Sequence, residues 1–177
     1  MSVLNLIPIG EIAKIKGGKR LPKGAELLDD VTEHYYIRVT DMHSDGINLA
    51  KLKYISSETH DSISNYIIRE NDVYVSIAGT IGRVGVISSL LDKANLTENA
   101  AKITNVREDF NPRFIMYFLR TVAGQAQMKA KAGGAAQPKL ALYRLAEIEI
   151  PQLDISVQNA IVDKIDNYNN LVEINDH

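Results

Sequence analysis

The chain has 177 residues, of which 45% are hydrophobic, and this is enough for one compact domain with an appendage. Cysteine is absent, which excludes a disulfide framework, a thiolate zinc site and a cysteine nucleophile, and fits a reducing compartment. Because the sequence has no signal-like N-terminus and no apolar run of roughly 18 residues, we expect a cytoplasmic protein without a membrane span.

The charges are unevenly distributed, although the net charge is only -2. Residues 14–23 hold five basic residues and residues 110–146 hold six, and neither stretch contains an acidic residue. Residues 24–75 hold four bases against ten acids, and residues 147–177 hold one base against seven acids. A single basic run is as often a solvated face as a binding surface. Two acid-free runs in a mildly acidic chain favour a nucleic-acid partner.

Short strands are predicted for the first two thirds of the chain, where apolar and polar residues alternate between turn residues. They are expected at residues 34–39, 53–55, 73–78, 84–87 and 101–106. This pattern predicts a mixed sheet of short strands.

Helical periodicity follows the strands. Asn111 and Pro112 form a typical helix start, because an Asn side chain caps the helix and proline is favoured at its first position. We expect this helix to end near Gly133 and Gly134. A short helix at residues 140–145 and a strand at 148–150 are expected next.

A last helix is predicted after Pro151, capped by Asp154 or Ser156. Its apolar residues step by four, three and four positions, which is a heptad seam; they are Ile161, Ile165, Tyr168 and Val172. About two heptads are too short for a stable isolated coiled coil, so the helix must pack on its own domain or on a partner. The predicted fold is therefore an α+β domain, residues 1–152, with packed helices, followed by a coiled-coil-type helix, residues 153–177.

The usual catalytic patterns are absent from the sequence. No acidic residue stands two positions before a lysine, so the acid-x-Lys element of common metal-dependent nucleases is missing. Gly79, Gly82 and Gly85 have neither dinucleotide-binding nor phosphate-loop spacing, and a strand follows them, which favours a hairpin or bulge. The four histidines are scattered. We therefore expect no catalytic residue, cofactor or metal. The aromatic content of 6% favours binding to duplex DNA over stacking on single strands.

Several segments in order resemble the specificity subunit of Type I restriction-modification systems. They are GGKRLPKG at 17–24, YIRVTDM at 36–42, DVYVSIAGTIGRVGVI at 72–87, NLTENAAKI at 95–103, AAQPKLAL at 135–142 and QNAIVDKID at 158–166. The resemblance covers nearly the whole chain, and it implies a restriction-modification DNA specificity domain.

The resemblance also implies a division of labour between subunits. Each recognition domain of the specificity subunit reads one half of a split double-stranded DNA site. Modification subunits supply methyl transfer, and restriction subunits supply ATP-driven translocation and cleavage. Family members carry two recognition domains separated by long helices, whereas this sequence has one domain and about twenty residues of one helix. It is either a half-subunit that forms a homodimer through its C-terminal helix or the N-terminal part of a longer protein.

Two of the matching segments supply candidate DNA-binding side chains on loops. Lys19, Arg20 and Lys23 lie between glycines, which favours a loop that approaches DNA closely and contacts phosphates. Gln137 carries an amide that can pair with adenine, and Lys139 can contact phosphate or guanine. Gln137 can equally brace its own loop, because a residue shared by family members with different targets cannot encode the target.

Two further pairs of candidates flank strands. Arg38 and Thr40 either contact DNA or close a turn, and Ser76 and Thr80 flank an apolar strand. The residues that read bases are expected in less family-like stretches, namely 43–66 and 123–134. Two other classes of function stay open: an adaptor whose acidic helix docks a protein partner, and an enzyme acting on nucleic acid through an unfamiliar site.

Overall fold

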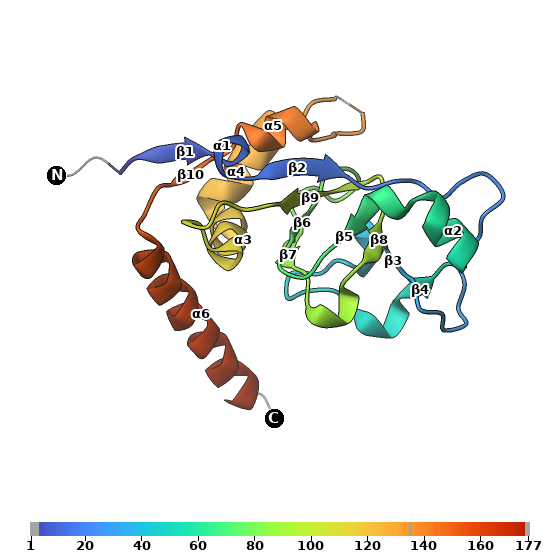
Figure 1. The fold of residues 1–177 in the computed structure, drawn as a ribbon. Coiled ribbons are helices and arrows are strands. Elements are labelled where there is room, and N and C mark those ends of the chain that lie inside the picture. The colour runs from blue at the N-terminus through green and yellow to red at the C-terminus, as the bar shows by residue number, and fades with distance from the viewer. Residues whose placement is uncertain (1–3, 135, 176–177) are drawn as a thin grey trace.

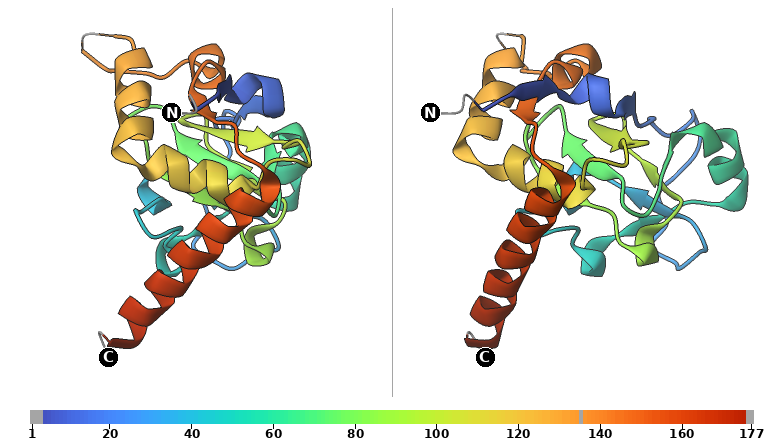
Figure 2. Two further views of the ribbon diagram at one scale, coloured as in Figure 1. Left: turned by 90° about the vertical axis from the view of Figure 1, so that its left-hand side faces the viewer. Right: turned by 60° about the vertical axis from the view of Figure 1, so that its left-hand side comes forward.

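The computed structural model describes residues 4–134 and 136–175 and shows an α+β protein, which confirms the predicted fold class (Figure 1). Three small sheets form the body, and a long C-terminal helix stands out from it (Figure 2). Within the described residues, no helix is both long and apolar enough to cross a membrane.

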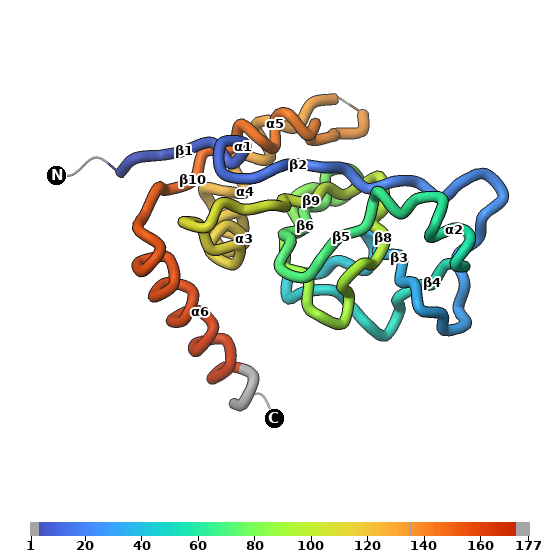
Figure 3. Tube along the Cα trace, in the orientation of Figure 1, coloured from blue at the N-terminus to red at the C-terminus, as the bar shows by residue number. Residues whose placement is uncertain are grey.

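A two-stranded antiparallel sheet joins the beginning of the chain to its last third. It consists of β1 (Leu6–Pro8) and β10 (Glu149–Pro151), with Ile7 opposite Ile150. The short helix α1 (Ile9–Ile12) follows β1 and leads into the strand β2 (Lys14–Gly17), so the start of the chain runs along one edge of the molecule (Figure 3). The α1 residues Ile9 and Ile12 are buried in the main core.

The central sheet is antiparallel throughout and has a helical layer on one face. Its strands, in spatial order, are β2 (Lys14–Gly17), β9 (Ala100–Thr104), β6 (Val73–Ser76) and β7 (Val84–Val86). The covering helices are α3 (Pro112–Arg120), α4 (Val122–Lys131) and α5 (Leu142–Ala146). The main core includes Val73 and Val75 from β6 with Ile115 and Leu119 from α3.

The second four-stranded sheet packs against the other face of β6. Its strands, in spatial order, are β4 (Lys53–Tyr54), β3 (Tyr35–Ile37), β8 (Ala94–Leu96) and β5 (Ile67–Ile68), and β3 pairs with β8 in parallel. Because side chains alternate along a strand, Tyr74 points into this second core while Val73 and Val75 point into the first. Strand β6 is therefore buried along its whole length.

Short helices surround this second sheet. They are α2 (Ser57–Ser62) and the 3-10 helices η1 (Val39–Asp41), η2 (Leu49–Lys51), η3 (Ser64–Tyr66) and η4 (Ser89–Leu91). The predicted strands are present as β3, β4, β6, β7 and β9, each shorter than its apolar run. The sequence analysis did not predict strands β1, β2, β5 and β8, because segments of two to four residues carry too little periodicity to be recognised.

The single helix predicted from Asn111 to Gly133 is wrong, because two helices occupy this stretch. The Asn111 side chain caps α3 by accepting a hydrogen bond from the backbone of Arg113 at 2.8 Å, as predicted. Thr121 then adopts an extended conformation, and its hydroxyl accepts a hydrogen bond from Gly124 N at 3.2 Å to start α4. A threonine that can cap a helix thus divides the run, although the apolar spacing continues through it.

The last helix, α6 (Ile155–Asn175), begins where predicted. Asp154 precedes it, and its carbonyl accepts hydrogen bonds from Val157 and Gln158, whereas Ser156 lies within the first turn. Its first half packs against α3, and the other half extends away from the body (Figure 2).

Candidate nucleic-acid interface

Four loops that are far apart in the sequence lie side by side at one end of the central sheet. We call them the rim; they comprise residues 17–24, 77–80, 97–99 and 136–140. Hydrogen bonds join each loop to the next, and between the first and third loops the Arg20 side chain donates to Glu98 Oε1 at 2.7 Å. The backbone contributes further bonds. Lys19 N donates to Leu96 O at 2.7 Å, Ala78 N donates to Asn99 O at 3.2 Å, and Leu140 N donates to Ile77 O at 2.9 Å. The rim is therefore one connected surface.

The first rim loop is held tightly against the end of β8. A Cβ atom on Gly18 would lie 2.1 Å from the carbonyl oxygen of Thr97, so no other residue fits there without moving the backbone. The hydroxyl of Tyr36 donates to the Lys19 carbonyl oxygen at 2.7 Å. The glycine pair of GGKRLPKG thus permits a close approach between two parts of the chain, and the basic residues that follow start from a fixed backbone.

The three basic side chains of this loop are all exposed, but their environments differ. The ammonium group of Lys19 lies 5.4 Å from the ring centroid of Tyr66. Arg20 pairs with Glu98, with Nε and Oε1 2.7 Å apart. This hydrogen bond raises the pKa of Arg20. Burial favours a higher pKa for Glu98, but hydrogen bonds from Arg20 and Thr97 outweigh it and lower that pKa. For Lys23, no ion pair is found within the described residues.

The structure brings three more predicted residues onto the rim. Thr80, Gln137 and Lys139 are exposed, and within the described part of the chain their side chains make no hydrogen bond or ion pair. The backbone of Lys139 bridges both Ala78 and Gly133, so its loop is fixed beside the turn that carries Thr80. Six of the nine predicted DNA-binding residues therefore lie exposed on one surface, and of these Arg20 is paired with Glu98.

Two predicted contacts are corrected by their surroundings. Ser76 is fully buried; its hydroxyl donates to Thr80 O at 2.5 Å and accepts from Arg83 N at 2.8 Å. It holds the turn in shape and is not accessible to DNA in this conformation. Arg38 donates from Nη2 to Asp41 at 2.6 Å and to Lys51 O at 3.0 Å, which is the turn-closing role left open by the sequence.

Thr40 is exposed on the turn that Arg38 closes. Arg83, which the sequence analysis did not single out, holds this turn close to the rim. Arg83 donates from Nη1 to Val39 O at 3.1 Å and to Met42 O at 2.6 Å. Asn99 was also missed, although it lies within a matching segment. Its backbone carbonyl accepts from Ala78 and its half-buried side chain makes no hydrogen bond within the described residues.

The apolar seam predicted for α6 is divided between two environments. Ile161 and Ile165 are half-buried, whereas Tyr168 is 68% exposed. The most buried side chains are Gln158 and Val162, which the heptad pattern leaves out. The packed face lies one residue away from the predicted seam, because α3 of the same domain covers it.

Val172, the last seam residue, is 42% exposed beside a cleft of about 830 Å³ that lies between the outer half of α6, α3, β7 and residues 44–46. Of the stretches expected to read bases, residues 43–66 run from this turn through η2, β4, α2 and η3, and residues 123–134 lie mainly in α4. In the part of the chain described by the structure, no group of three or more His, Asp or Glu side chains is arranged to hold a metal ion.

Comparison with known proteins identifies similar chains. The sequence is 27% identical over 130 residues to the specificity subunit of the Type I restriction enzyme EcoBI from Escherichia coli, covering 73% of this chain and 27% of that subunit. The fold is similar to the crystal structure of the Type I restriction-modification S subunit from M. genitalium, with 20% identity and a TM-score of 0.61. This match covers 98% of this chain and 41% of that subunit. The fold is also similar to the crystal structure of the HsdS subunit from Thermoanaerobacter tengcongensis, with 15% identity and a TM-score of 0.66. This match covers 96% of this chain and 38% of that subunit.

A further similar structure comes from a study titled as the structural basis of complex assembly and conformational transition of the Type I system, with 15% identity and a TM-score of 0.72. It covers 96% of this chain and 39% of that one. The chain thus spans about a quarter of the curated relative and about two fifths of the solved structures. A family model described as the Type I restriction modification DNA specificity domain matches residues 4–177. The resemblance read from the sequence is therefore confirmed, and the chain belongs to the Type I restriction modification DNA specificity domain family.

Proposed function

We propose that the chain is one target-recognition domain that binds duplex DNA through the rim and directs partner subunits to one half of a split site. The observation that supports this most is the joining of four distant loops into a single surface with Lys19, Lys23 and Lys139 exposed on it. Exposed cations on fixed loops suit contacts to phosphates, which position a protein on DNA.

The exposed polar side chains of the rim suit a different part of the same task. Gln137 can pair bidentately with adenine, and Thr80 can hydrogen-bond to a base edge. Their neighbours Lys139 and Lys19 place phosphate contacts on either side. We propose that the chain itself is not catalytic, and that modification subunits methylate the site while restriction subunits act through them.

Assembly is proposed to use the outer half of α6. Tyr168 and Val172 are exposed there, on a helix that needs packing to be stable along its whole length. The occupant is either a second copy of this chain or the second half of a longer subunit, together with the modification subunits. Residues 1–152 form the recognition domain in this proposal, and residues 153–177 form the interface helix.

Co-expression with the modification subunits, followed by mapping of methylated positions, tests this function. We expect co-purification and methylation at a split sequence that is lost when the chain is omitted. Binding of duplex DNA should weaken steeply with salt, because counterions are released when cations neutralise phosphates. Co-purification without DNA binding at low salt would instead favour an adaptor that docks a protein. Methylation or cleavage by the rigorously pure chain would favour an enzyme.

A further inference from the structure

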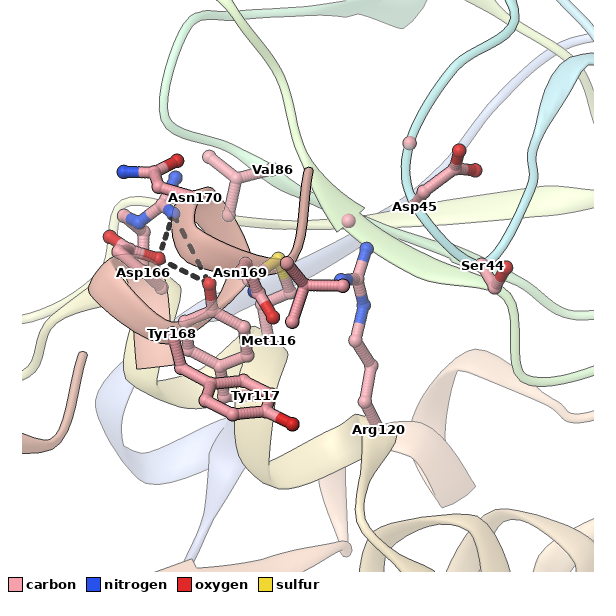
Figure 4. Close-up of a pocket in the computed structure, with 14 residues that line it drawn as sticks. Ser44, Asp45, Val86, Met116, Tyr117, Arg120, Asp166, Tyr168, Asn169 and Asn170 are labelled. Carbon is pink, nitrogen blue, oxygen red and sulfur yellow. Dashed lines mark hydrogen bonds and ion pairs between the residues drawn. The ribbon is translucent and has the colours of Figure 1, made fainter. Parts of the chain in front are cut away.

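The inner half of α6 packs closely against the body of the protein. Gln158 is fully buried and Val162 is 4% exposed, whereas Tyr168 is 68% exposed. Beyond that point the cleft of about 830 Å³ separates the helix from the turn at residues 44–46 (Figure 4). The path of the outer half therefore depends on contacts near the middle of the helix.

A polar cluster of three side chains joins the middle of α6 to α3. The Asp166 carboxylate accepts a hydrogen bond from Arg113 Nη2 at 2.5 Å and another from the Tyr117 hydroxyl (Figure 4). Arg113 and Tyr117 are four residues apart on α3 and so lie on one face of that helix. Two donors from one rigid element thus hold a single carboxylate, which defines its position better than an isolated surface ion pair does.

The base of α6 is fixed by a second, buried contact. The side-chain nitrogen of Gln158 donates to Asp109 O at 2.9 Å and to Leu153 O at 2.8 Å, and its oxygen accepts from Asn111 N at 2.9 Å. Gln158 and Asp166 are eight residues apart, or about 12 Å along a helix axis. One fixed point leaves a helix free to swing, whereas two points this far apart define its direction.

We infer that Asp166 is a positioning residue that, with Arg113 and Tyr117, fixes the direction of α6 relative to the rim. Without the cluster, the outer half of α6 loses a fixed point and can turn about the inner contacts at Gln158 and Val162, so the distance from the rim to the end of the helix varies. This inference rests on the proposed function for its consequence, which is that the cluster helps to set the spacing between the two halves of the DNA site.

A distance measurement on the full chain tests the inference directly. The sequence has no cysteine, so two introduced cysteines can be spin-labelled without background. Ser89→Cys on η4 and Asn170→Cys near the end of α6 are both at exposed positions. Dilution with unlabelled chain restricts the electron–electron distance to pairs within one molecule. We expect a single narrow distance distribution for the doubly labelled parent.

Asp166→Ala should broaden this distance distribution or shift it, and Arg113→Ala should do the same. Combining the two substitutions should have no additional effect, because each of them removes the same interaction. Asp166→Glu retains a carboxylate and should restore most of the narrow peak. Asp163→Ala is the matched control, since Asp163 is exposed on the same helix and makes no ion pair within the described residues. Unchanged melting temperatures establish that the domain remains folded.

The outcomes separate this inference from the proposed function. A broad distribution in the parent, or an unchanged narrow one in Asp166→Ala, would overturn the positioning role whatever the chain binds. Half-site DNA affinity should be equal in all these variants, because the rim is untouched; absence of DNA binding in the parent defeats the proposed function and leaves the distance result standing. In the assembled complex, Asp166→Ala should relax the spacing of methylated half-sites while leaving each half-site sequence unchanged.

Discussion

The pairing of Arg20 with Glu98 predicts that removing one acidic charge will strengthen DNA binding. The two groups are 2.7 Å apart, and the Arg20 side chain is 80% exposed whereas that of Glu98 is 27% exposed. Arg20 can reach a phosphate only by sharing or leaving the Glu98 carboxylate. Glu98→Gln keeps the size of the side chain and removes the charge that competes with phosphate for Arg20.

The magnitude follows from counterion release. Each additional neutralised phosphate steepens the dependence of log K on log salt by about 0.9, which corresponds to about a fivefold gain in affinity at about 0.15 M salt. We therefore expect Glu98→Gln to steepen the slope by up to about one unit. Replacing Lys19, Arg20 and Lys23 together by alanine should flatten the slope by about two to three units and weaken binding to every sequence on the order of 10²-fold.

Fluorescence anisotropy of labelled duplexes at several salt concentrations measures both quantities. Glu70→Gln is the matched control, because Glu70 is exposed before the start of β6, at the opposite end of that strand from the rim, and the substitution changes the net charge equally. DNA binding that persists with an unchanged slope in both Glu98→Gln and the triple variant would refute phosphate contact by this loop. A changed target preference at constant slope would show that the three residues read bases.

Three further predictions concern the core and α6. Tyr74→Phe should raise the free energy of unfolding, measured in urea, by about 1 kcal/mol. The reason is that the buried Tyr74 hydroxyl has no hydrogen-bond partner within the described residues, and burial raises its pKa to about 12. A clear loss of stability would contradict this prediction. Tyr168→Asp with Val172→Asp should abolish assembly in sedimentation experiments without lowering the melting temperature, and a lowered melting temperature would show that these residues pack on their own domain. Burial acts to raise the pKa of Asp166, but hydrogen bonds from Arg113 and Tyr117 outweigh it and lower that pKa. The contribution of this cluster to the docking of α6 should therefore be complete above the ordinary Asp pKa of about 3.9 and be lost as pH falls through the lowered pKa of the docked carboxylate. An NMR titration midpoint for Asp166 at or above about 3.9 would contradict this prediction.

The success and failure of the sequence predictions have physical explanations in particular residues. The cap at Asn111 was predictable because capping depends on neighbouring residues alone. The break at Thr121 was not, because the apolar spacing continues across it while Gly124 lies so close to the backbone of α3 that a Cβ atom would be 2.4 Å from Phe118 O. On α6 the face that packs on α3 lies one residue from the predicted seam, since Gln158 is buried for its hydrogen bonds and not for its hydrophobicity, and the seam stays a prediction for the subunit interface.

The sequence by itself determined the fold class, the family and the basic loops, because these depend on composition, periodicity and local motifs that are present in the chain order. Only the tertiary structure decided which candidate residues lie together. Pairing of β2 with β9 and bridging of Ala78 to Lys139 bring loops more than a hundred residues apart onto one rim. The tertiary structure also buries Ser76 and makes Arg38 close a turn through its bond to Asp41. Burial and hydrogen-bond partners arise from contacts between distant segments, so no local pattern in the sequence contains them.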